Sequence, residues 1–247
     1  MNDFKFKNLS SYTNIIHKIT EKNNTHNCLN SLALHTNEPK EQILINRERL
    51  TTEFVNMKFV VANQTHSNHI KVIKESIELG WSDKESAIDD CDALITNQKN
   101  LMLTILTADC VPILLFCPKK NVISAIHAGW KGTLGKIVIN AVETMKEEFG
   151  VNSKDIVASI APSIGECCYE VSKEVAQKFD EYQNAYTLTN GSYMLNLPLI
   201  NELQLKSVGV KNIEQSNICT ACENEKYFSY RKEGGCSGRF MSMIGLI

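Results

Sequence analysis

Two residues that could carry chemistry, Cys110 and His127, lie on neighbouring apolar runs of the sequence. Cys110 opens the run CVPILLF, and His127 stands near the end of the run VISAIHAGW, with the segment PKKN (118–121) between them. Because Pro, Lys and Asn favour a turn between two apolar strands, we expect a hairpin here. Cys110 would begin one strand and His127 would end its partner, so both fall at the same edge of a sheet. The sequence therefore predicts a Cys–His pair.

This pair permits two kinds of chemistry, and its spacing leaves both open, as well as a structural role for Cys110 as a small buried residue. In the first, His127 deprotonates Cys110, and the thiolate is a nucleophile. In the second, Cys110, His127 and His66 of the NQTHS segment bind zinc. Three protein ligands with an open fourth position are typical of a catalytic zinc site. Water bound there is acidic enough to act as a nucleophile near neutral pH.

Two segments carry groups that suit anions and rings. In HAGWKGTLGKI, glycines follow the strand and a helix is expected to begin near Thr133, with Lys131 beside it. Free N–H groups at a helix N-terminus attract anions, which predicts a phosphate site or, more simply, a tight turn. Near the carboxyl end, aromatic residues stand beside Arg231 and Arg239. Aromatic faces stack on bases, and arginine forks hold phosphate.

The remaining cysteines are interpreted as structural. Cys219 and Cys222 form a CxxC motif, which is half of a zinc site. No second CxxC and no histidine follows nearby in the sequence, so we assign the motif no metal. Cys167 and Cys168, in SIAPSIGECCYEV, are expected in a close-packed turn.

The elements that must position these residues mix helices and strands along the whole length. Strands are expected at 58–66, 92–96, 101–110, on both sides of the 118–121 turn and at 155–162, and helices at 39–50, 134–149 and 196–209. With one hairpin among them, this mixture predicts a mixed-sheet α/β domain of the α+β type. We expect a single catalytic domain over residues 1–247, with residues 1–29 a partly mobile amino-terminal segment because 21–30 is rich in Asn and Thr.

Composition excludes several classes of function. The net charge is −2, which predicts no affinity for nucleic acid or for an anionic membrane surface. No stretch approaches the length of a membrane span, and the first residues lack the apolar region of a secretory signal. The nine cysteines follow no regular framework. We therefore expect a cytoplasmic protein with reduced thiols.

Taken together, the motifs resemble one family. NQTHS, DALIT, LTADCVPILL, AIHAGWKGT, APSIGECCYEV, CT and YFSYRKEG follow one another in the order typical of the bacterial polyphenol oxidase or laccase-domain family, also called the YfiH family of purine nucleoside phosphorylases. The resemblance runs from about residue 30 to the carboxyl end, and TADCVP paired with HAGW is its most specific part. It implies one α/β domain with mixed sheets layered against helices.

The resemblance also implies a function and a metal. It implies a zinc site formed by His66, Cys110 and His127, with copper as the alternative ion. It implies phosphorolysis of adenosine, inosine and 5′-methylthioadenosine, with deamination of adenosine as a side activity. A zinc-activated water could attack C6 of adenine in such a pocket, as in other nucleobase deaminases. The partners would be purine nucleosides and phosphate, and the protein a monomer or a homodimer.

Further roles are assigned as hypotheses on the same basis. Phosphate would be held by Arg47, Lys131 and Arg231, and Asp109 would accept a proton or orient the cluster. One departure from the family is Lys131, where arginine is usual after HAGW. Lysine keeps the charge but loses the planar fork that holds phosphate with two hydrogen bonds, so we expect weaker phosphate binding.

Two rival functions stay open. A hydrolase or amidase using Cys110 and His127 without metal is the first, and it would suit the editing of cell-wall precursors. A copper polyphenol oxidase is the second and less favoured, because multicopper sites need many histidines and the chain has six.

Overall fold

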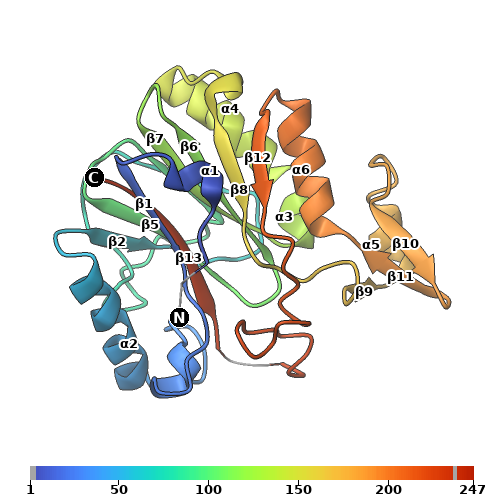
Figure 1. Ribbon diagram of the computed structural model, residues 1–247, viewed down its shortest axis with the longest axis horizontal. Coiled ribbons are helices and arrows are strands. Elements are labelled where there is room, and N and C mark those ends of the chain that lie inside the picture. Colours follow the sequence, from blue (N-terminus) through green and yellow to red (C-terminus); the bar gives the residue numbers. More distant parts are fainter. Residues whose placement is uncertain (1–3, 236–237) are drawn as a thin grey trace.

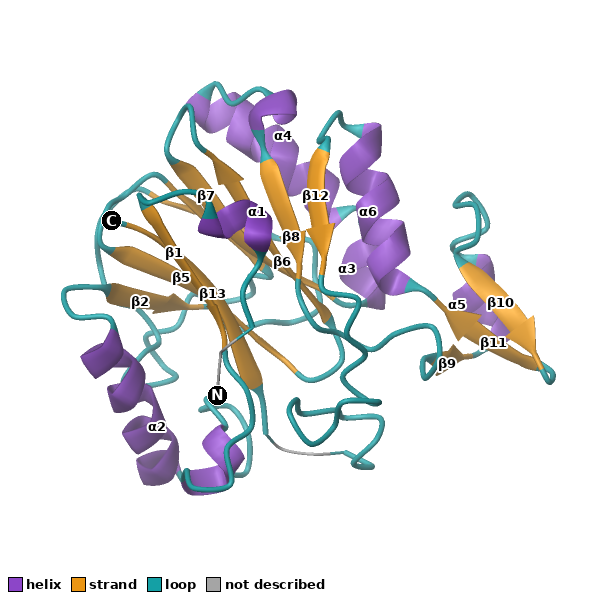
Figure 2. Ribbon diagram, in the orientation of Figure 1, coloured by secondary structure: helices purple, strands orange, loops and turns teal. Residues whose placement is uncertain are grey.

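The computed structural model describes residues 4–235 and 238–247. Two large sheets pack face to face, with helices on both outer sides (Figure 1, Figure 2). Apolar residues alternate along the strands so that each sheet contributes to two cores: Leu114 and Phe116 face the other sheet, whereas Ile113 and Leu115 face the helices. The mixed α/β class with sheets layered against helices is confirmed.

The six-stranded sheet carries the predicted hairpin. Its order is β12-β8-β6-β7-β4-β3, with the bounds Asn212–Gln215, Val157–Ile160, Val111–Cys117, Val122–Ala128, Ala93–Thr96 and Ile70–Ile73. β6 and β7 are antiparallel, and their register places Pro112 opposite His127. The hairpin is confirmed. Val111, which follows Cys110, pairs with Ala128, which follows His127, so Cys110 and His127 lie at the same edge of the sheet.

The four-stranded sheet joins the two ends of the chain. Its order is β1-β13-β5-β2, with the bounds Ile15–Ile19, Phe240–Leu246, Leu101–Thr107 and Lys58–Val61. β1 pairs antiparallel with β13, and Phe6 and Ile19 are fully buried. This strand pairing anchors residues 15–19, while most of the residues between 4 and 29 are half-buried or exposed. The mobility expected of residues 1–29 stays a prediction, and residues 1–3 lie outside the described residues. The few apolar residues here are too widely spaced to indicate a strand by themselves.

Helices cover the outer faces of the two sheets. α4 (Ile137–Phe149) and α6 (Leu197–Ser207) lie on the six-stranded sheet with the short α3 (Trp130–Leu134), as Figure 1 shows. Helices are confirmed in the predicted regions, but the one expected to begin near Thr133 is divided: Lys136, with a left-handed φ of 58°, separates α3 from α4. Gly150 ends α4 with a left-handed φ of 63°, and the Asn196 side chain accepts a hydrogen bond from the Leu199 N–H at the start of α6.

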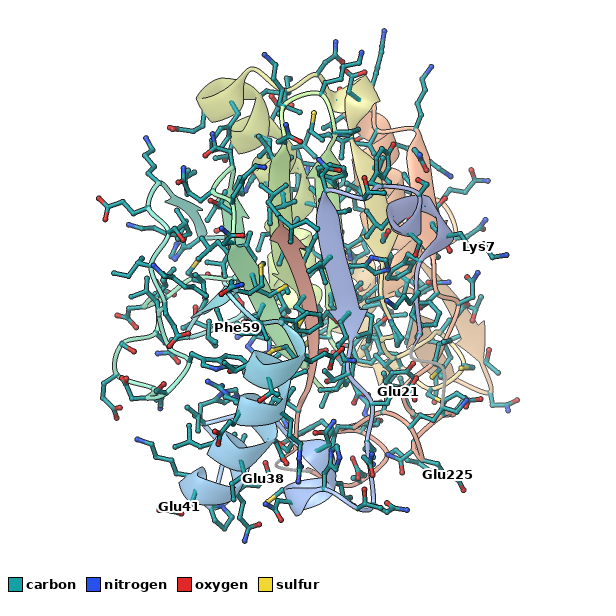
Figure 3. All side chains as sticks on the ribbon, turned by 60° about the vertical axis from the view of Figure 1, so that its left-hand side comes forward. Lys7, Glu21, Glu38, Glu41, Phe59 and Glu225 are labelled. Carbon is teal, nitrogen blue, oxygen red and sulfur yellow. The ribbon has the colours of Figure 1, made fainter. Side chains whose placement is uncertain are left out.

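α2 (Lys40–Glu53) covers the other sheet. Figure 3 shows Phe59 where α2 meets this sheet, and the Phe59 ring stacks on Trp81 with 3.9 Å between centroids. The minor helices are α1 (Lys7–Ser10), α5 (Lys173–Gln177) and the 3₁₀ turns Asn27–Asn30 and Ser153–Asp155. None of the described helices is both long and apolar enough to cross a membrane.

A small third sheet projects from the body. β9 (Glu170–Val171), β11 (Ser192–Leu195) and β10 (Tyr186–Thr189) form an antiparallel sheet that stands apart with α5 on the right of Figure 1. The sequence analysis did not predict it, because its strands are short and largely exposed and so lack the apolar alternation of a packed strand.

Candidate active site

Three side chains that the sequence analysis singled out meet at one edge of the six-stranded sheet. The ligand atoms of His66, Cys110 and His127 all lie within 4.8 Å of one another. Cys110 Sγ lies 3.7 Å from His66 Nε2, and the two imidazole rings meet edge to face with 4.8 Å between centroids. Two nitrogens and one sulfur at such distances match the donors that zinc prefers.

Each of the three residues is held by a different part of the backbone. His127 is the penultimate residue of β7, and Cys110 immediately precedes β6. His66 follows β2 in a loop and adopts a left-handed φ of 63°. Gly129 makes the close approach feasible, since a Cβ there would lie 2.9 Å from His66 Cδ2 and 3.2 Å from Cys110 Sγ. The glycine of the HAGW motif therefore keeps space for the cluster.

Asp92 organises the cluster, although the sequence analysis noted it only as the first residue of a strand. Its fully buried carboxylate accepts a 2.7 Å hydrogen bond from His127 Nδ1. The same carboxylate accepts hydrogen bonds from the backbone N–H groups of His66 (3.1 Å) and Ser67 (2.7 Å). Nδ1 of His127 is thus occupied, which leaves Nε2 for Cys110 or a metal. An acidic residue directly before a buried strand, in DALIT, was the signal that could have revealed it.

The charges of Cys110 and His127 stabilise each other. Burial alone would raise the pKa of Cys110, but the charge of His127 and hydrogen bonds from both histidines lower it to about 6. Burial alone would lower the pKa of His127, but the Cys110 thiolate and Asp92 raise it to about 9. Without a metal, the two residues therefore form a thiolate–imidazolium pair at neutral pH. The thiolate is the form that acts as a ligand or a nucleophile.

A cavity of about 440 Å³ opens over the cluster. Its walls include the aromatic residues Trp130, Tyr169 and Tyr230 and the cations Arg231 and Arg239. The Arg231 guanidinium lies over the Tyr169 ring, 5.4 Å from its centroid. This volume and this mixture of apolar rings with a few charged groups are typical of a small-molecule site.

Asp109 lines this cavity, but its carboxylate bonds to a loop and not to the cluster. It accepts 2.7 Å hydrogen bonds from Thr220 Oγ1 and from the backbone N–H of Arg231. Both oxygens are therefore engaged with the segment 220–231. These contacts tie Asp109 to the backbone of Arg231, and its expected role as proton acceptor or orienter of the cluster stays a prediction.

Of the three expected phosphate ligands, Arg231 alone is among the residues that line the cavity. Arg47 is 1% exposed, and its guanidinium donates to the backbone carbonyls of Leu32, Gly80 and Trp81. Arg47 is thus occupied in joining loops, and its expected phosphate-binding role does not fit its position. Lys131 is exposed on α3 with its Nζ 5.7 Å from the Trp130 ring centroid, outside the cavity wall. Arg239, which the sequence analysis placed beside aromatic residues, does line it.

Comparison with known proteins gives a consistent match. The family model described as multi-copper polyphenol oxidoreductase laccase matches residues 21–247. A protein from Clostridium acetobutylicum named purine nucleoside phosphorylase is 37% identical over 219 residues, which cover 87% of this chain and 91% of that one. Adenosine deaminase RL5, from an unknown prokaryotic organism, is 35% identical over 75% of this chain and 74% of its own. The crystal structure of YlmD from Geobacillus stearothermophilus superposes with a TM-score of 0.89 at 29% identity, covering 95% of this chain and 93% of that one.

Proposed function

Because this chain belongs to the multi-copper polyphenol oxidoreductase laccase family, whose matched relatives are named purine nucleoside phosphorylases, we propose that it is a purine nucleoside phosphorylase with adenosine deaminase side activity. Its substrates would be adenosine, inosine and 5′-methylthioadenosine, with phosphate as the second substrate. The observation that carries the proposal is the convergence of His66, Cys110 and His127 in one cavity with aromatic and arginine walls.

The residues of the cluster fit a metal ion. They offer two imidazole nitrogens and a thiolate, and Asp92 accepts a hydrogen bond from the ligand His127, as is typical of zinc-bound histidines. A zinc ion held there would supply Lewis-acid activation of water or of a polar substrate atom. Two histidines with one cysteine are also a donor set used by copper, so both metals are to be measured.

The cavity wall suits the two substrates of phosphorolysis. A purine ring would stack on Trp130, Tyr169 or Tyr230, since aromatic faces bind flat rings without needing a specific hydrogen bond. The planar guanidinium of Arg231 would hold phosphate next to the ribose, with Arg239 on the same wall. The hydrogen bond to Asp92 fixes the orientation of the His127 ring, so that Nε2 of His127 faces His66 and Cys110.

A second candidate function is a cysteine hydrolase or amidase without metal. The observation that favours it is the chain of contacts Asp92, His127 and Cys110, in which the carboxylate orients a histidine beside a thiol whose pKa is about 6. This order matches the orienter, base and nucleophile of a catalytic triad. It uses the same residues as the metal site, so one experiment separates the two.

The deciding experiment measures bound zinc and copper beside phosphate-dependent release of adenine from adenosine. Wild-type protein is compared with His127→Ala and with His69→Ala, a matched control at an exposed histidine paired with Asp90. We expect zinc and activity in the wild type and in the control, and in His127→Ala the loss of activity together with the zinc ion held by this cluster. A chelator should abolish activity, and added zinc should restore it.

The opposite pattern would support the hydrolase. It would be an enzyme that releases no base from nucleosides, keeps its amidase activity in chelator and loses that activity on alkylation of Cys110. Bound copper together with oxidation of phenols would support a copper polyphenol oxidase instead.

A further inference from the structure

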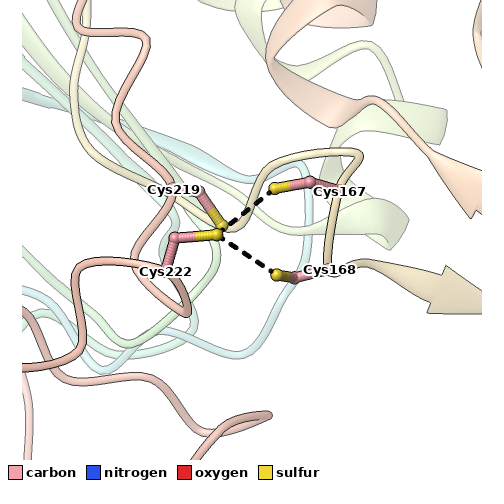
Figure 4. Close-up of side chains that lie close together, drawn as sticks. All are labelled: Cys167, Cys168, Cys219 and Cys222. Carbon is pink, nitrogen blue, oxygen red and sulfur yellow. Dashed lines mark hydrogen bonds between the residues drawn. The ribbon is translucent and has the colours of Figure 1, made fainter.

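Four cysteines outside the active site come together on the surface. Cys167 and Cys168 lie in the turn after β8, and Cys219 and Cys222 lie in the turn after β12. Figure 4 shows the four side chains pointing toward one another from these two turns. Their sulfur atoms all lie within 4.8 Å of one another. The sequence analysis found no partner for the CxxC motif, but the fold brings to it two further thiols from the adjacent pair Cys167-Cys168, whose second residue is 51 residues earlier than Cys219.

The sulfur spacing distinguishes one metal ion from the other uses of clustered thiols. Cys222 Sγ lies 3.6 Å from Cys167 Sγ and 3.5 Å from Cys168 Sγ. A disulfide needs about 2.05 Å between sulfurs. A tetrahedral zinc with bonds of about 2.3 Å places its thiolates about 3.8 Å apart. An iron–sulfur cluster inserts several atoms between its cysteines and requires wider separations than these.

The backbone around the sulfurs is shaped for this convergence. The N–H of Gly165 donates to Cys219 Sγ at 3.2 Å, a contact that stabilises a thiolate. A Cβ at Gly165 would lie 3.3 Å from Cys167 Sγ and 3.2 Å from Cys219 Cβ, so the absence of a side chain lets the turns meet. The turns are also joined by hydrogen bonds between Ser163 and the segment 218–220. Cys167 and Cys222 are exposed, so burial of apolar surface does not explain why they gather.

We propose that Cys167, Cys168, Cys219 and Cys222 bind one zinc ion in a closed, structural site. Four thiolates select a soft or borderline ion and leave no open position for a substrate. Each thiol that becomes a ligand releases its proton to solvent as the ion binds, and no oxidant or reductant takes part.

The ion would hold the wall of the active-site cavity in place. Tyr169, which lines the cavity, directly follows Cys168, and Arg231 donates from its guanidinium to the Glu170 carbonyl at 2.9 Å. On the other turn, Thr220 lies between Cys219 and Cys222 and donates to Asp109. Zinc would therefore fix two turns that each make a contact with the substrate site. The proposal does not depend on the nature of the reaction.

The first test counts zinc in protein purified from zinc-supplemented medium. We expect two zinc ions in the wild type, one in Cys110→Ser/His127→Ala and one in Cys167→Ser/Cys222→Ser. Cys28→Ser, at a partly buried cysteine far from both groups in the sequence, serves as control and should keep two. If the Cys110→Ser/His127→Ala protein folds and holds no zinc, the four-cysteine site is overturned, whereas failure of the phosphorylase proposal leaves the zinc count of this variant unaffected.

A second test measures whether zinc protects the four cysteines from alkylation. Wild-type protein is alkylated with iodoacetamide with zinc present and after chelation, and each cysteine is mapped by mass spectrometry. Zinc should protect all four cysteines from alkylation, and chelation should expose them.

Spectroscopy of the cobalt-substituted protein identifies the ligands. With cobalt in place of zinc, Cys110→Ser/His127→Ala should show the thiolate-to-metal charge-transfer absorption and the visible bands of a tetrahedral cobalt site. Equal alkylation with and without zinc, or a Cys167–Cys222 disulfide in the protein as purified, would contradict the proposal.

Discussion

The two groups of possible metal ligands in this protein differ in their donor atoms, their burial and their surroundings. His66, Cys110 and His127 gather where a strand pair meets a loop, around a fully buried carboxylate. The four cysteines gather on two surface turns, and two of them are exposed. The first group has mixed donors and lines a cavity with aromatic and arginine walls, whereas the second has four identical donors. The first is therefore suited to chemistry and the second to holding loops.

The difference also lies in what positions the donors. The β6–β7 register and the Asp92 hydrogen bonds would keep His127 in place without any ion. Few backbone hydrogen bonds join the two turns that carry the four cysteines. An ion bound there would therefore add substantially to the contacts that hold these turns together. Metal removal should accordingly abolish activity at the first site and lower stability at the second.

The largest effect is expected at Cys110. Cys110→Ser should lower phosphorolysis of adenosine by about 10³-fold or more, the scale of losing a principal catalytic group. Cys222→Ser, the matched change in the other group, should alter the rate at 25 °C by less than about tenfold but lower the melting temperature. Steady-state kinetics and thermal unfolding on both variants provide the measurement. Equal losses of activity in Cys110→Ser and Cys222→Ser would contradict the assignment of a catalytic role to the first group and a structural role to the second.

The next effect concerns the support of the active cluster. Asp92→Asn keeps the shape of the side chain but removes its charge and offers His127 Nδ1 a less suitable partner. We expect activity or zinc affinity to fall about 10- to 100-fold, as for other carboxylates that orient a metal-bound histidine. A zinc titration beside the kinetics distinguishes weaker metal binding from a slower reaction. An unchanged variant would show that the strand register alone positions His127.

A smaller effect should separate the expected phosphate ligands. Arg231→Lys keeps the charge but loses the fork, and should raise the KM for phosphate about tenfold with kcat less affected. Lys131→Ala, outside the cavity wall, should leave this KM within about twofold. Phosphate titrations at saturating adenosine measure both values. A larger effect at Lys131 would reverse the assignment and restore the role expected from its place after HAGW.

The smallest effect tests a histidine remote from both groups. His17 is buried in β1, accepts a 3.0 Å hydrogen bond from the Phe6 N–H through Nε2, and has a pKa lowered to about 4, first by burial and then by Lys5. The unfolded chain binds this proton near pH 6.5, so stability is complete above pH 6.5 and falls as the pH drops from 6.5 to 4. His17 should contribute about 1 kcal/mol to the loss between pH 6 and pH 5.

Urea unfolding across this pH range gives the measurement. His17→Gln, which can still accept the hydrogen bond, should show a correspondingly shallower decline between pH 6 and pH 5. An identical slope in the variant would assign the acid sensitivity to other groups, among them the pocket-lining His35, whose pKa burial also lowers to about 4.

Much of the fold could be predicted from local patterns. The hairpin was marked by two apolar runs around Pro118 and Asn121, and α4 by its apolar spacing and Gly150. The small sheet around β10 was not predictable, because exposed short strands carry no alternation. β1 was missed because it pairs with β13, more than 200 residues later, and no local pattern reports such a partner.

The candidate site shows the same division. The Cys110–His127 pair follows from strand register, which a sequence reveals when the turn is clear. Asp92 was missed because its importance comes from one loop and one strand that converge on its carboxylate. Arg47 was expected to bind phosphate because an arginine on a helix is usually exposed. No local sequence pattern predicts that its guanidinium will donate hydrogen bonds to three backbone carbonyls. The joining of two cysteine pairs from different turns is likewise a tertiary event.

The place of β13 also affects how the protein is made. This strand lies between β1 and β5 in its sheet, so it completes both neighbours at once. During synthesis β1 and β5 emerge long before the strand that joins them, because β13 begins at residue 240 and β5 ends at residue 107. Until then the apolar edge of β5 stays open to other chains. The growing polypeptide would thus expose an edge prone to aggregation until β13 has been synthesised and paired.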